Sequence, residues 1–278
     1  MPQANATSAT ATFHAQDVSV RFGGLVALDS VSLKVTPGQV HGVIGPNGAG
    51  KTTLFNVCCG FVRPDGGTLT WHDKTLTGLR PHKLAGLKIA RTLQGVGLFG
   101  GLTVLENVMV GAAETAKVGF WSAALGLPRS DKDEKALRDR AWATLEELDA
   151  TAIAGRHPGT LAYPDQKRVA LARAIAADPE LLLLDEPASG LSEAEMTELG
   201  DIARTLTARM SVMLVEHHMD LVMRVCDEIT VLDFGTVIAH GTPDEVRDDP
   251  AVVAAYLGAD VAAGDEIDVA TLKGARHG

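Results

Sequence analysis

The chain has 278 residues, of which 46% are apolar and 22% are charged. This composition is typical of a globular protein and excludes a largely disordered chain. The 25 Lys and Arg are outnumbered by 35 Asp and Glu, which gives a formal net charge of −10. Nucleic acid is therefore disfavoured as the main partner, because duplex binding needs a basic footprint.

Cysteine content and the pattern of apolar residues indicate the cellular compartment of the chain. Three cysteines, Cys58, Cys59 and Cys226, are too few for a disulfide framework, and we expect them in the core. Residues 1–12 lack the basic and apolar regions of a signal peptide, and no apolar run approaches the ~20 residues of a membrane span. The expectation is a cytosolic chain that reaches a membrane only by docking.

Apolar periodicity predicts the elements in chain order. Residues 1–13 are small and polar and are expected to form a flexible tail. Alternating or continuous apolar runs predict strands at 18–20, 31–35, 39–44, 181–184, 212–215 and 229–233. Helical spacing predicts helices at 51–59, 102–111, 130–150 and 163–177. On the third of these helices one apolar face is expected to comprise Leu137, Trp142, Leu145 and Leu148.

The order of these elements predicts an α/β fold. Strands that alternate with helices suit a parallel sheet with crossover connections. An antiparallel β region is expected near the N-terminus, and a helical subdomain over about 95–177. Residues 14–258 are expected to form the folded domain, and residues 259–278, rich in Ala, Gly and Asp, a C-terminal tail.

A phosphate-binding loop is the first motif that carries chemistry. Residues 45–52 read GPNGAGKT and fit the pattern GxxxxGK[ST], which a chain of this length matches by chance about once in 100. In such a loop successive N–H groups surround an anion, while Lys51 reaches the β- and γ-phosphates and the Thr52 hydroxyl ligates Mg²⁺. The residues predicted to bind a nucleotide here are Gly45, Asn47, Gly48, Ala49, Gly50, Lys51, Thr52 and Thr53.

A carboxylate pair is the second such motif. The apolar run 181–184 is followed directly by Asp185 and Glu186. Ligands of open parallel sheets bind beyond the carboxyl ends of the strands. We therefore expect Asp185 to hold Mg²⁺, directly or through water, and Glu186 to polarise an attacking water. A polar turn after a buried strand is the alternative, which the preceding phosphate loop disfavours.

The phosphate loop and the carboxylate pair, taken in chain order with further motifs, resemble those of the ATP-binding-cassette (ABC) family. The resemblance covers roughly residues 13–258. Gln94 in ARTLQ resembles the Q-loop, His217 in VEH resembles the switch histidine, and Phe22 occupies the position that stacks on adenine. The D-loop position contains Ser189, Gly190 and Leu191. The signature position contains Leu161, Ala162, Tyr163, Pro164, Asp165 and Gln166.

Within the family, four stretches look like the ATPases of branched-chain amino acid importers: 21–28, 102–108, 231–243 and 255–258. The resemblance implies a P-loop ABC ATPase at the cytoplasmic face of the cell membrane, with ATP and Mg²⁺ as cofactors. It implies transmembrane permease subunits and a second ABC ATPase subunit as partners, and indirectly an extracytoplasmic solute-binding protein. An exposed groove of the helical subdomain is expected to accept a short permease helix.

The resemblance also implies a mechanism. ATP lies between the phosphate loop of one subunit and the signature of another, and closure of the dimer drives transport. Glu186 is then the catalytic base, and His217 supports the γ-phosphate and this base. Gln94 helps to place Mg²⁺ and water and links the site to transport.

The signature departs from the family pattern at two positions. The Ser position is Ala162, which has no hydroxyl, and the Gly position is Pro164, which has no N–H. Proline is tolerated in a first helical turn, so the fold is expected to survive. Each lost donor to a charged group costs ~1.5–3 kcal/mol. Two losses would therefore slow hydrolysis by about 10²–10⁴-fold.

These departures favour a heterodimer whose partner supplies a better signature to the site built on Lys51 and Glu186. The alternative is that other N–H groups of the helix replace the lost donors. Asp165 adds a negative charge nearby, and Ser192, at the end of the D-loop, keeps a side chain that bonds backbone.

Competing functions remain at this point. A non-transport ABC protein that acts on nucleic acid or ribosomes is disfavoured by the single cassette and the net charge of −10. A regulatory subunit that binds ATP with little hydrolysis, and a transporter ATPase for another solute, are the remaining alternatives. His217 and His218 are adjacent and are expected to point apart, with His218 at the surface, which disfavours a metal pair.

Overall fold

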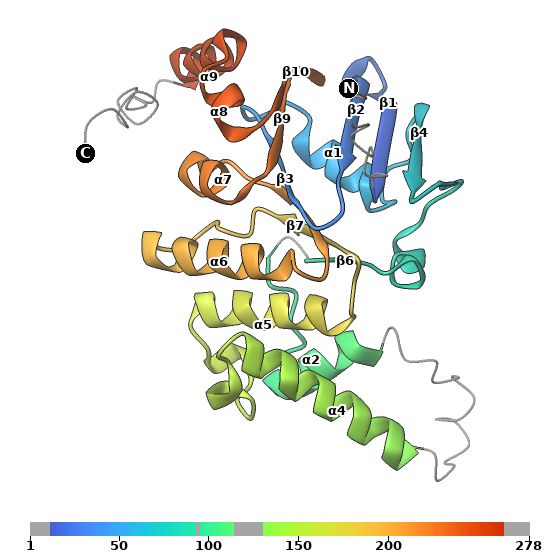
Figure 1. Cartoon of the computed structure of the whole chain (residues 1–278), viewed down its shortest axis with the longest axis vertical. Coiled ribbons are helices and arrows are strands. Elements are labelled where there is room, and N and C mark those ends of the chain that lie inside the picture. The colour runs from blue at the N-terminus through green and yellow to red at the C-terminus, as the bar shows by residue number, and fades with distance from the viewer. Residues whose placement is uncertain (1–11, 93–94, 114–129, 264–278) are drawn as a thin grey trace, which may run out of the picture. The chain divides into compact units, whose positions relative to one another are not determined.

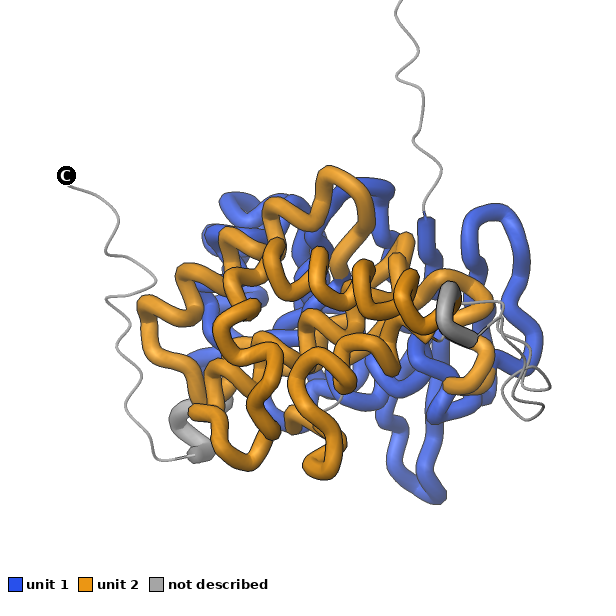
Figure 2. Tube along the Cα trace, turned by 90° about the horizontal axis from the view of Figure 1, so that it is seen from below, with its two compact units in different colours: residues 1–79, 213–278 blue, residues 80–212 orange. Residues whose placement is uncertain are grey.

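The computed structural model describes residues 12–92, 95–113 and 130–263 (Figure 1). The chain separates into two compact units, coloured in Figure 2. The first comprises residues 1–79 and 213–278, and the second comprises residues 80–212. The phosphate loop therefore belongs to the first unit, and the carboxylate pair and the signature belong to the second.

The first unit contains an antiparallel sheet in the order β2-β1-β4-β5. Its strands are β1 (Phe13–Phe22), β2 (Leu25–Val35), β4 (Gly66–Trp71) and β5 (Lys74–Thr75). Phe13 pairs with both Val35 and Trp71 and is fully buried. The strand begins at Phe13, one residue before the expected start of the folded domain. The antiparallel region expected near the N-terminus is confirmed.

A second sheet has six strands in the order β10-β9-β3-β8-β7-β6. They are β3 (Val40–Ile44), β6 (Ile89–Arg91), β7 (Leu181–Asp185), β8 (Ser211–Val215), β9 (Glu228–Asp233) and β10 (Thr236–Gly241). Strand β3 pairs in parallel with β9, and β6 with β7, whereas β10 is antiparallel to β9. Strands β3 and β8 are buried along their whole length, as both-sided burial in a parallel sheet requires.

The helices of the first unit are α1 (Lys51–Cys58), α7 (Met219–Val225), α8 (Pro243–Arg247) and α9 (Pro250–Ala263). Helix α8 begins at a capping box, in which the Thr242 side chain accepts from the Glu245 N–H and Glu245 bonds back to Thr242. All three cysteines are buried, so their expected place in the core is confirmed. Burial raises the pKa of the Cys58 thiol far above its usual range, which keeps it inert.

The second unit is mainly helical. Its helices are α2 (Val104–Ala113), α4 (Ser130–Glu147), α5 (Tyr163–Ala176) and α6 (Glu193–Leu206). Its 3₁₀ turns are η1 (Pro81–Lys83), η2 (Ala85–Leu87), η3 (Thr151–Ile153) and η4 (Pro158–Thr160). Gly111 lets α2 approach α5 closely, because a Cβ there would overlap the carbonyl oxygen of Arg173. None of the helices in the described residues has the length and apolar character that a membrane crossing requires.

One prediction about helix α4 is wrong. Trp142 is 41% exposed, and its ring N–H donates to Glu146. The buried face instead comprises Ala141, Thr144, Leu145 and Leu148. These four follow the i, i+3, i+4, i+7 pattern of one helix face, and Trp142 lies about 100° from Ala141 around the axis.

Helix α6 carries the last predicted feature of the D-loop region. Ser192 is its N-cap: its hydroxyl accepts from the Glu195 N–H, and the Glu195 carboxylate accepts from the Ser192 N–H at 2.7 Å. The expectation that a serine here still bonds backbone is confirmed. This reciprocal capping satisfies two backbone donors that would otherwise lack partners at the start of the helix.

Candidate functional site

The phosphate loop, residues 45–50, connects β3 to α1 and has the backbone that its glycines predict. Gly45, Gly48 and Gly50 have φ angles of 149°, 81° and 101°, a region that glycine enters without a steric cost. A Cβ at Gly50 would lie 2.7 Å from the carbonyl oxygen of Ala27, and one at Gly45 would overlap a carbonyl oxygen in β9. The loop therefore requires glycine for its conformation and for its close packing.

Lys51 begins α1 and is buried. Its ammonium donates to the carbonyl oxygens of Gly45 at 2.6 Å and Pro46 at 2.9 Å, which compensates for the loss of hydration. The first turn of α1 has no side-chain cap and no acidic residue, and Thr52 is exposed. The helix therefore keeps its positive N-terminal potential for an anion.

An exposed aromatic ring lies at the hairpin between β1 and β2. Phe22 pairs with Leu25, and the two side chains are 52% and 65% exposed. Val26, the next residue of β2, is 41% exposed. Exposed apolar side chains gathered at one hairpin offer a surface on which a planar base can stack.

The carboxylate pair ends strand β7. Leu181–Leu184 are buried, Asp185 is the last strand residue, and Glu186 follows it with partly exposed side chain. Glu186 has a φ of 45°, in the left-handed region. A left-handed residue other than glycine costs about 1–2 kcal/mol, so its neighbours must hold it in this conformation.

Lys167, on α5, is one of those neighbours. Its ammonium donates to the carbonyl oxygens of Glu186 at 3.2 Å and Pro187 at 2.8 Å. The same ammonium lies 5.4 Å from the centroid of the Tyr163 ring, within the range of a cation–π contact. Tyr163 in turn packs on the D-loop, because a Cβ at Gly190 would lie 3.0 Å from its ring. The signature helix thus clamps the turn that carries Glu186.

The N-terminus of α5 is the predicted signature. Ala162 is the N-cap and offers no side-chain bond, and Tyr163 and Pro164 are the first two helical residues. Gln166 closes the first turn: its N–H donates to Ala162 at 3.1 Å and its side chain donates to Leu161 at 3.0 Å. The expectation that Pro164 leaves the helix intact is confirmed. Asp165 lies in the first turn.

One cavity of the second unit brings several predicted residues together. It has a volume of about 200 Å³. The predicted residues that line it are Tyr163, Pro164, Asp185, Glu186, Ser189 and Leu191. Its apolar wall comes from β7, α5 and α6 and includes Leu171, Leu184 and Ile202. The carboxylate pair, the D-loop and the signature are therefore neighbours within this unit. Gln94 lies outside the described residues.

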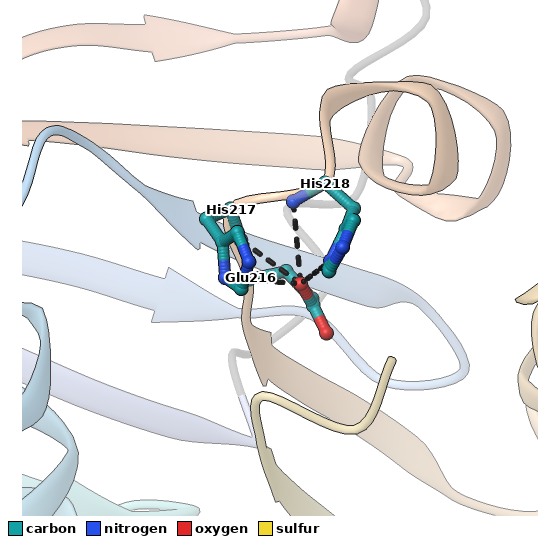
Figure 3. A group of neighbouring side chains, drawn as sticks. All are labelled: Glu216, His217 and His218. Carbon is teal, nitrogen blue, oxygen red and sulfur yellow. Dashed lines mark hydrogen bonds and ion pairs between the residues drawn. The ribbon is translucent and has the colours of Figure 1, made fainter. Parts of the chain in front are cut away.

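The segment after β8 corrects the expectation that His217 and His218 point apart. Their ring centroids are 4.1 Å apart, and both rings lie beside the carboxylate of Glu216 (Figure 3). Glu216 is fully buried, and its Oε2 atom accepts the backbone N–H groups of His217 at 2.9 Å and His218 at 3.3 Å. His217 is 48% exposed, whereas His218 is 31% exposed and bonds Glu216, so it is not a free surface residue.

Comparison with protein families settles what kind of chain this is. Residues 28–189, more than half of the sequence, match the family model described as ABC transporter. The chain belongs to the ABC transporter family. A second model, described as branched-chain amino acid ATP-binding cassette transporter, matches residues 236–262. That match covers β10, α8 and most of α9, including Tyr256, whose phenol has its pKa raised to about 12 by burial.

Curated relatives agree with this assignment to the ABC transporter family. The high-affinity branched-chain amino acid transport ATP-binding protein LivG of Escherichia coli K12 is 42% identical over 241 residues, 86% of this chain and 94% of the relative. BraF of Pseudomonas aeruginosa, which has the same description, is 41% identical over 243 residues, 87% of this chain and 95% of the relative.

Solved structures agree as well. A nucleotide-free ATP-binding cassette from an ABC transporter has a TM-score of 0.77 at 29% identity, over 88% of this chain and 98% of that chain. A cassette in its ADP conformation has a TM-score of 0.77 at 30% identity, over 89% and 99%. The predicted α/β fold with a P-loop ABC core sheet, an antiparallel β region and a helical part is confirmed.

Two ABC cassette residues that the sequence analysis missed now stand out. The sequence does not single out Lys167, which follows the signature residues, or Glu216, which precedes His217. Lys167 acts on carbonyl groups 19 and 20 residues away, which only the fold brings near. Glu216 accepts the N–H groups of the next two residues, because the chain turns around its carboxylate there. A lysine one turn into a helix and a glutamate after a buried strand are common at solvated surfaces.

Proposed function

We propose that this chain is the ATP-binding and ATP-hydrolysing subunit of a membrane importer for branched-chain amino acids. The observation that carries the proposal is the intact phosphate loop: three glycines with positive φ, the buried Lys51 and the uncapped N-terminus of α1. Such a loop binds a nucleotide phosphate through backbone N–H groups. The match of residues 236–262 and the two relatives support the solute class.

Roles for the loop residues follow from their chemistry. Gly45, Gly48 and Gly50 let the backbone surround the phosphates, and Lys51 neutralises the β- and γ-phosphate charge. Binding requires the Lys51 ammonium to exchange carbonyl acceptors for phosphate oxygens, a stronger charge-assisted bond. Phe22 stacks on the adenine.

The oxygen donors of the chain suit Mg²⁺. The hydroxyl of Thr52, the carboxylate of Asp185 and the amide of Gln94 are hard ligands of the type this ion prefers. Thr52 is exposed and Asp185 partly exposed at the end of β7, so both have room for a hydrated ion. When bound, Mg²⁺ neutralises charge on the phosphate oxygens.

Glu186 is the proposed general base. It accepts a proton from the attacking water, and its held backbone fixes the point on the chain from which the carboxylate extends. His217 supports the γ-phosphate and this base. A half-exposed imidazole after β8 is free to face a ligand on its solvent side.

Partners follow from the proposed transport role. Permease subunits bind the helical part, expected over about 95–177, and the chain lies at the cytoplasmic face of the cell membrane. The second ATPase subunit is a different chain, because Ala162 and Pro164 supply fewer donors than a Ser and a Gly would. A solute-binding protein outside the membrane delivers the amino acid to the permease.

The test is ATP hydrolysis by the purified chain as a function of its concentration, with Glu186→Gln as the control. We expect wild type and variant to bind ATP equally. We expect turnover to stay near the variant's level until a partner ATPase with a complete signature is added. It should then rise at least 10²-fold for wild type only.

Two other outcomes would change the proposal. Brisk turnover that rises with concentration in the chain alone would establish a working homodimer and overturn the defective signature. Turnover that stays at the Glu186→Gln level with every partner would favour the regulatory alternative, a subunit that binds ATP with little hydrolysis. Transport assays in vesicles with leucine and with unrelated solutes separate the solute classes.

A further inference from the structure

Three consecutive side chains after β8 converge on one point. The Oε2 atom of Glu216 lies 3.0 Å from Nδ1 of His218 and 3.7 Å from Nδ1 of His217 (Figure 3). One ligand atom from each of the three residues lies within 4.8 Å of the other two. All three residues belong to the first unit.

The backbone explains this convergence. Regular strands send adjacent side chains to opposite faces, but residues 216–218 follow β8 without regular structure. Glu216 turns its carboxylate inward, and its Oε2 atom accepts the next two backbone N–H groups. The chain therefore wraps around one oxygen, and the Nδ1 atoms of both imidazoles lie near it.

The ligand atoms of this cluster favour one class of metal ion. Two imidazole nitrogens and one carboxylate oxygen suit Zn²⁺ and its neighbours in the first transition series, whereas Mg²⁺ prefers oxygen ligands. A tetrahedral Zn²⁺ site with bonds of about 2.0–2.1 Å places neighbouring ligand atoms about 3.4 Å apart. The two nitrogen–oxygen distances in the structure, 3.0 and 3.7 Å, bracket that value.

The surroundings favour entry of an ion. The carboxylate is buried, but the His217 and His218 side chains are 48% and 31% exposed. An ion can therefore approach from the histidine side, and water can complete its coordination. The buried carboxylate supplies the negative charge that a site of two neutral imidazoles needs.

We propose that Glu216, His217 and His218 form a binding site for a Zn²⁺-type transition-metal cation. Binding replaces the His218 hydrogen bond to Glu216 with metal ligation and fixes the His217 ring through Nδ1. The site also gives the cation an inhibitory role, which rests on the proposed function: a His217 ring held beside Glu216 is unavailable to the γ-phosphate.

The first experiment measures Zn²⁺ binding by the full-length chain in competition with a chromophoric chelator, without nucleotide. His218→Asn is the test variant, because asparagine keeps a donor to Glu216 and removes the imidazole. His82→Asn, an exposed histidine on η1, is the matched control. We expect wild type and His82→Asn each to bind one equivalent of Zn²⁺ tightly, and His218→Asn to bind Zn²⁺ at least 100-fold more weakly.

Equal affinity in His218→Asn and wild type, or no wild-type binding below 100 µM as an order-of-magnitude limit, would overturn the site. The buried cysteines are present in all three proteins, so binding through thiols would show as equal affinity. Should His218→Asn fail to fold, the visible spectrum of Co²⁺ bound to wild type decides. Four-coordinate nitrogen and oxygen ligation supports the site, and sulfur charge-transfer bands or a six-coordinate spectrum overturn it.

The second experiment measures ATP turnover of the complex with the partner ATPase, with and without Zn²⁺ in excess Mg²⁺. The rate of each protein is compared with its own Zn²⁺-free rate. We expect at least a tenfold loss for wild type and His82→Asn and less than a twofold loss for His218→Asn. Equal losses in all proteins would overturn the inhibitory role. The first experiment measures Zn²⁺ binding without ATP hydrolysis. A chain that never hydrolyses ATP would therefore refute the proposed function, while the Zn²⁺-binding experiment would still test the metal site.

Discussion

Two helix N-termini in this molecule are proposed to face the phosphates of ATP, and they differ in the groups that they offer to an anion. Helix α1, after the phosphate loop, has Gly50 as its N-cap, with a φ of 101°, and has no acidic residue in its first turn. Helix α5, the predicted signature, has Ala162 as its N-cap, Pro164 as its second residue and Asp165 as its third. Neither is capped by a side chain.

The contrast shows that helix formation and anion binding have different requirements. Proline in a first turn removes an N–H that has no partner inside the helix, so α5 forms without loss. The same N–H is one that an anion would use, and Asp165 lowers the potential at this terminus. Helix α1 keeps both its N–H groups and its positive potential, and it adds the Lys51 ammonium.

The largest effect should come from repairing the weaker terminus. We expect Ala162→Ser with Pro164→Gly to raise turnover of the chain alone by about 10²–10⁴-fold, because two donors to a charged group return at ~1.5–3 kcal/mol each. Pro164→Ala is the matched variant, since it returns the N–H without the flexibility of glycine. Steady-state hydrolysis at several chain concentrations measures both.

The repaired chain needs its own controls. Adding Glu186→Gln should remove the gained activity, which shows that it arises at the carboxylate site. Thermal unfolding should change little, because the helix does not depend on Pro164. A rate equal to that of wild type would mean that other N–H groups of α5 already serve the anion, and the contrast between the two termini would disappear.

The backbone of the phosphate loop before α1 could be predicted from the sequence, whereas the contacts that α5 makes could not. The glycine spacing of the phosphate loop encodes its backbone directly, so positive φ at Gly45, Gly48 and Gly50 was foreseeable. The clamp of Lys167 on Glu186 joins residues 19 apart in sequence through a carbonyl oxygen. No side-chain pattern records such a contact.

Errors elsewhere have equally physical causes. Strands β4, β6 and β10 were not foreseen, because they are short or partly exposed and lack a sustained apolar alternation. His217 and His218 were expected to diverge because regular structure was assumed where the chain instead wraps around Glu216. Trp142 was expected to be buried because it lies three residues before the buried Leu145. The buried face also contains Ala141 and Thr144, and Trp142 lies beside it.

A second prediction tests whether α5 supports the turn that carries Glu186 rather than binding a ligand. We expect Lys167→Met to lower kcat about tenfold in the complex that hydrolyses ATP, while ATP affinity stays within twofold. The reason is that the left-handed Glu186 backbone loses a charged donor worth ~1.5–3 kcal/mol. Lys167→Arg should restore part of the rate.

Arg168→Met is the matched control for Lys167→Met. Arg168 is the next residue of α5, and its side chain makes a two-pronged ion pair with Glu198 at 2.8 Å rather than a bond to the Glu186 carbonyl. Its loss should lower stability slightly and leave kcat unchanged. If both variants lowered kcat alike, the clamp would be a general packing effect of α5 and not a support of Glu186.

A third prediction concerns the stability of the fold and the strand that precedes the phosphate loop. The strand before the phosphate loop, β3, contains His41, which is fully buried and bonded through Nε2 to Thr230 at 2.9 Å. Burial, aided by nearby His240, lowers its pKa to about 3. The folded chain therefore keeps a neutral imidazole at pH values where the unfolded chain, with a pKa near 6.5, binds a proton.

The sign of the pH effect follows from this difference. Stability from the neutral His41 is complete above about pH 6.5 and is lost as the pH falls toward 3, because the unfolded state binds more protons. Between pH 7.5 and 5 the loss is about 2 kcal/mol. We expect His41→Gln to remove it in urea unfolding curves, and His82→Gln, at an exposed position, to retain it. An unchanged pH dependence in His41→Gln would show that the strand below the phosphate loop does not set the acid sensitivity of the fold.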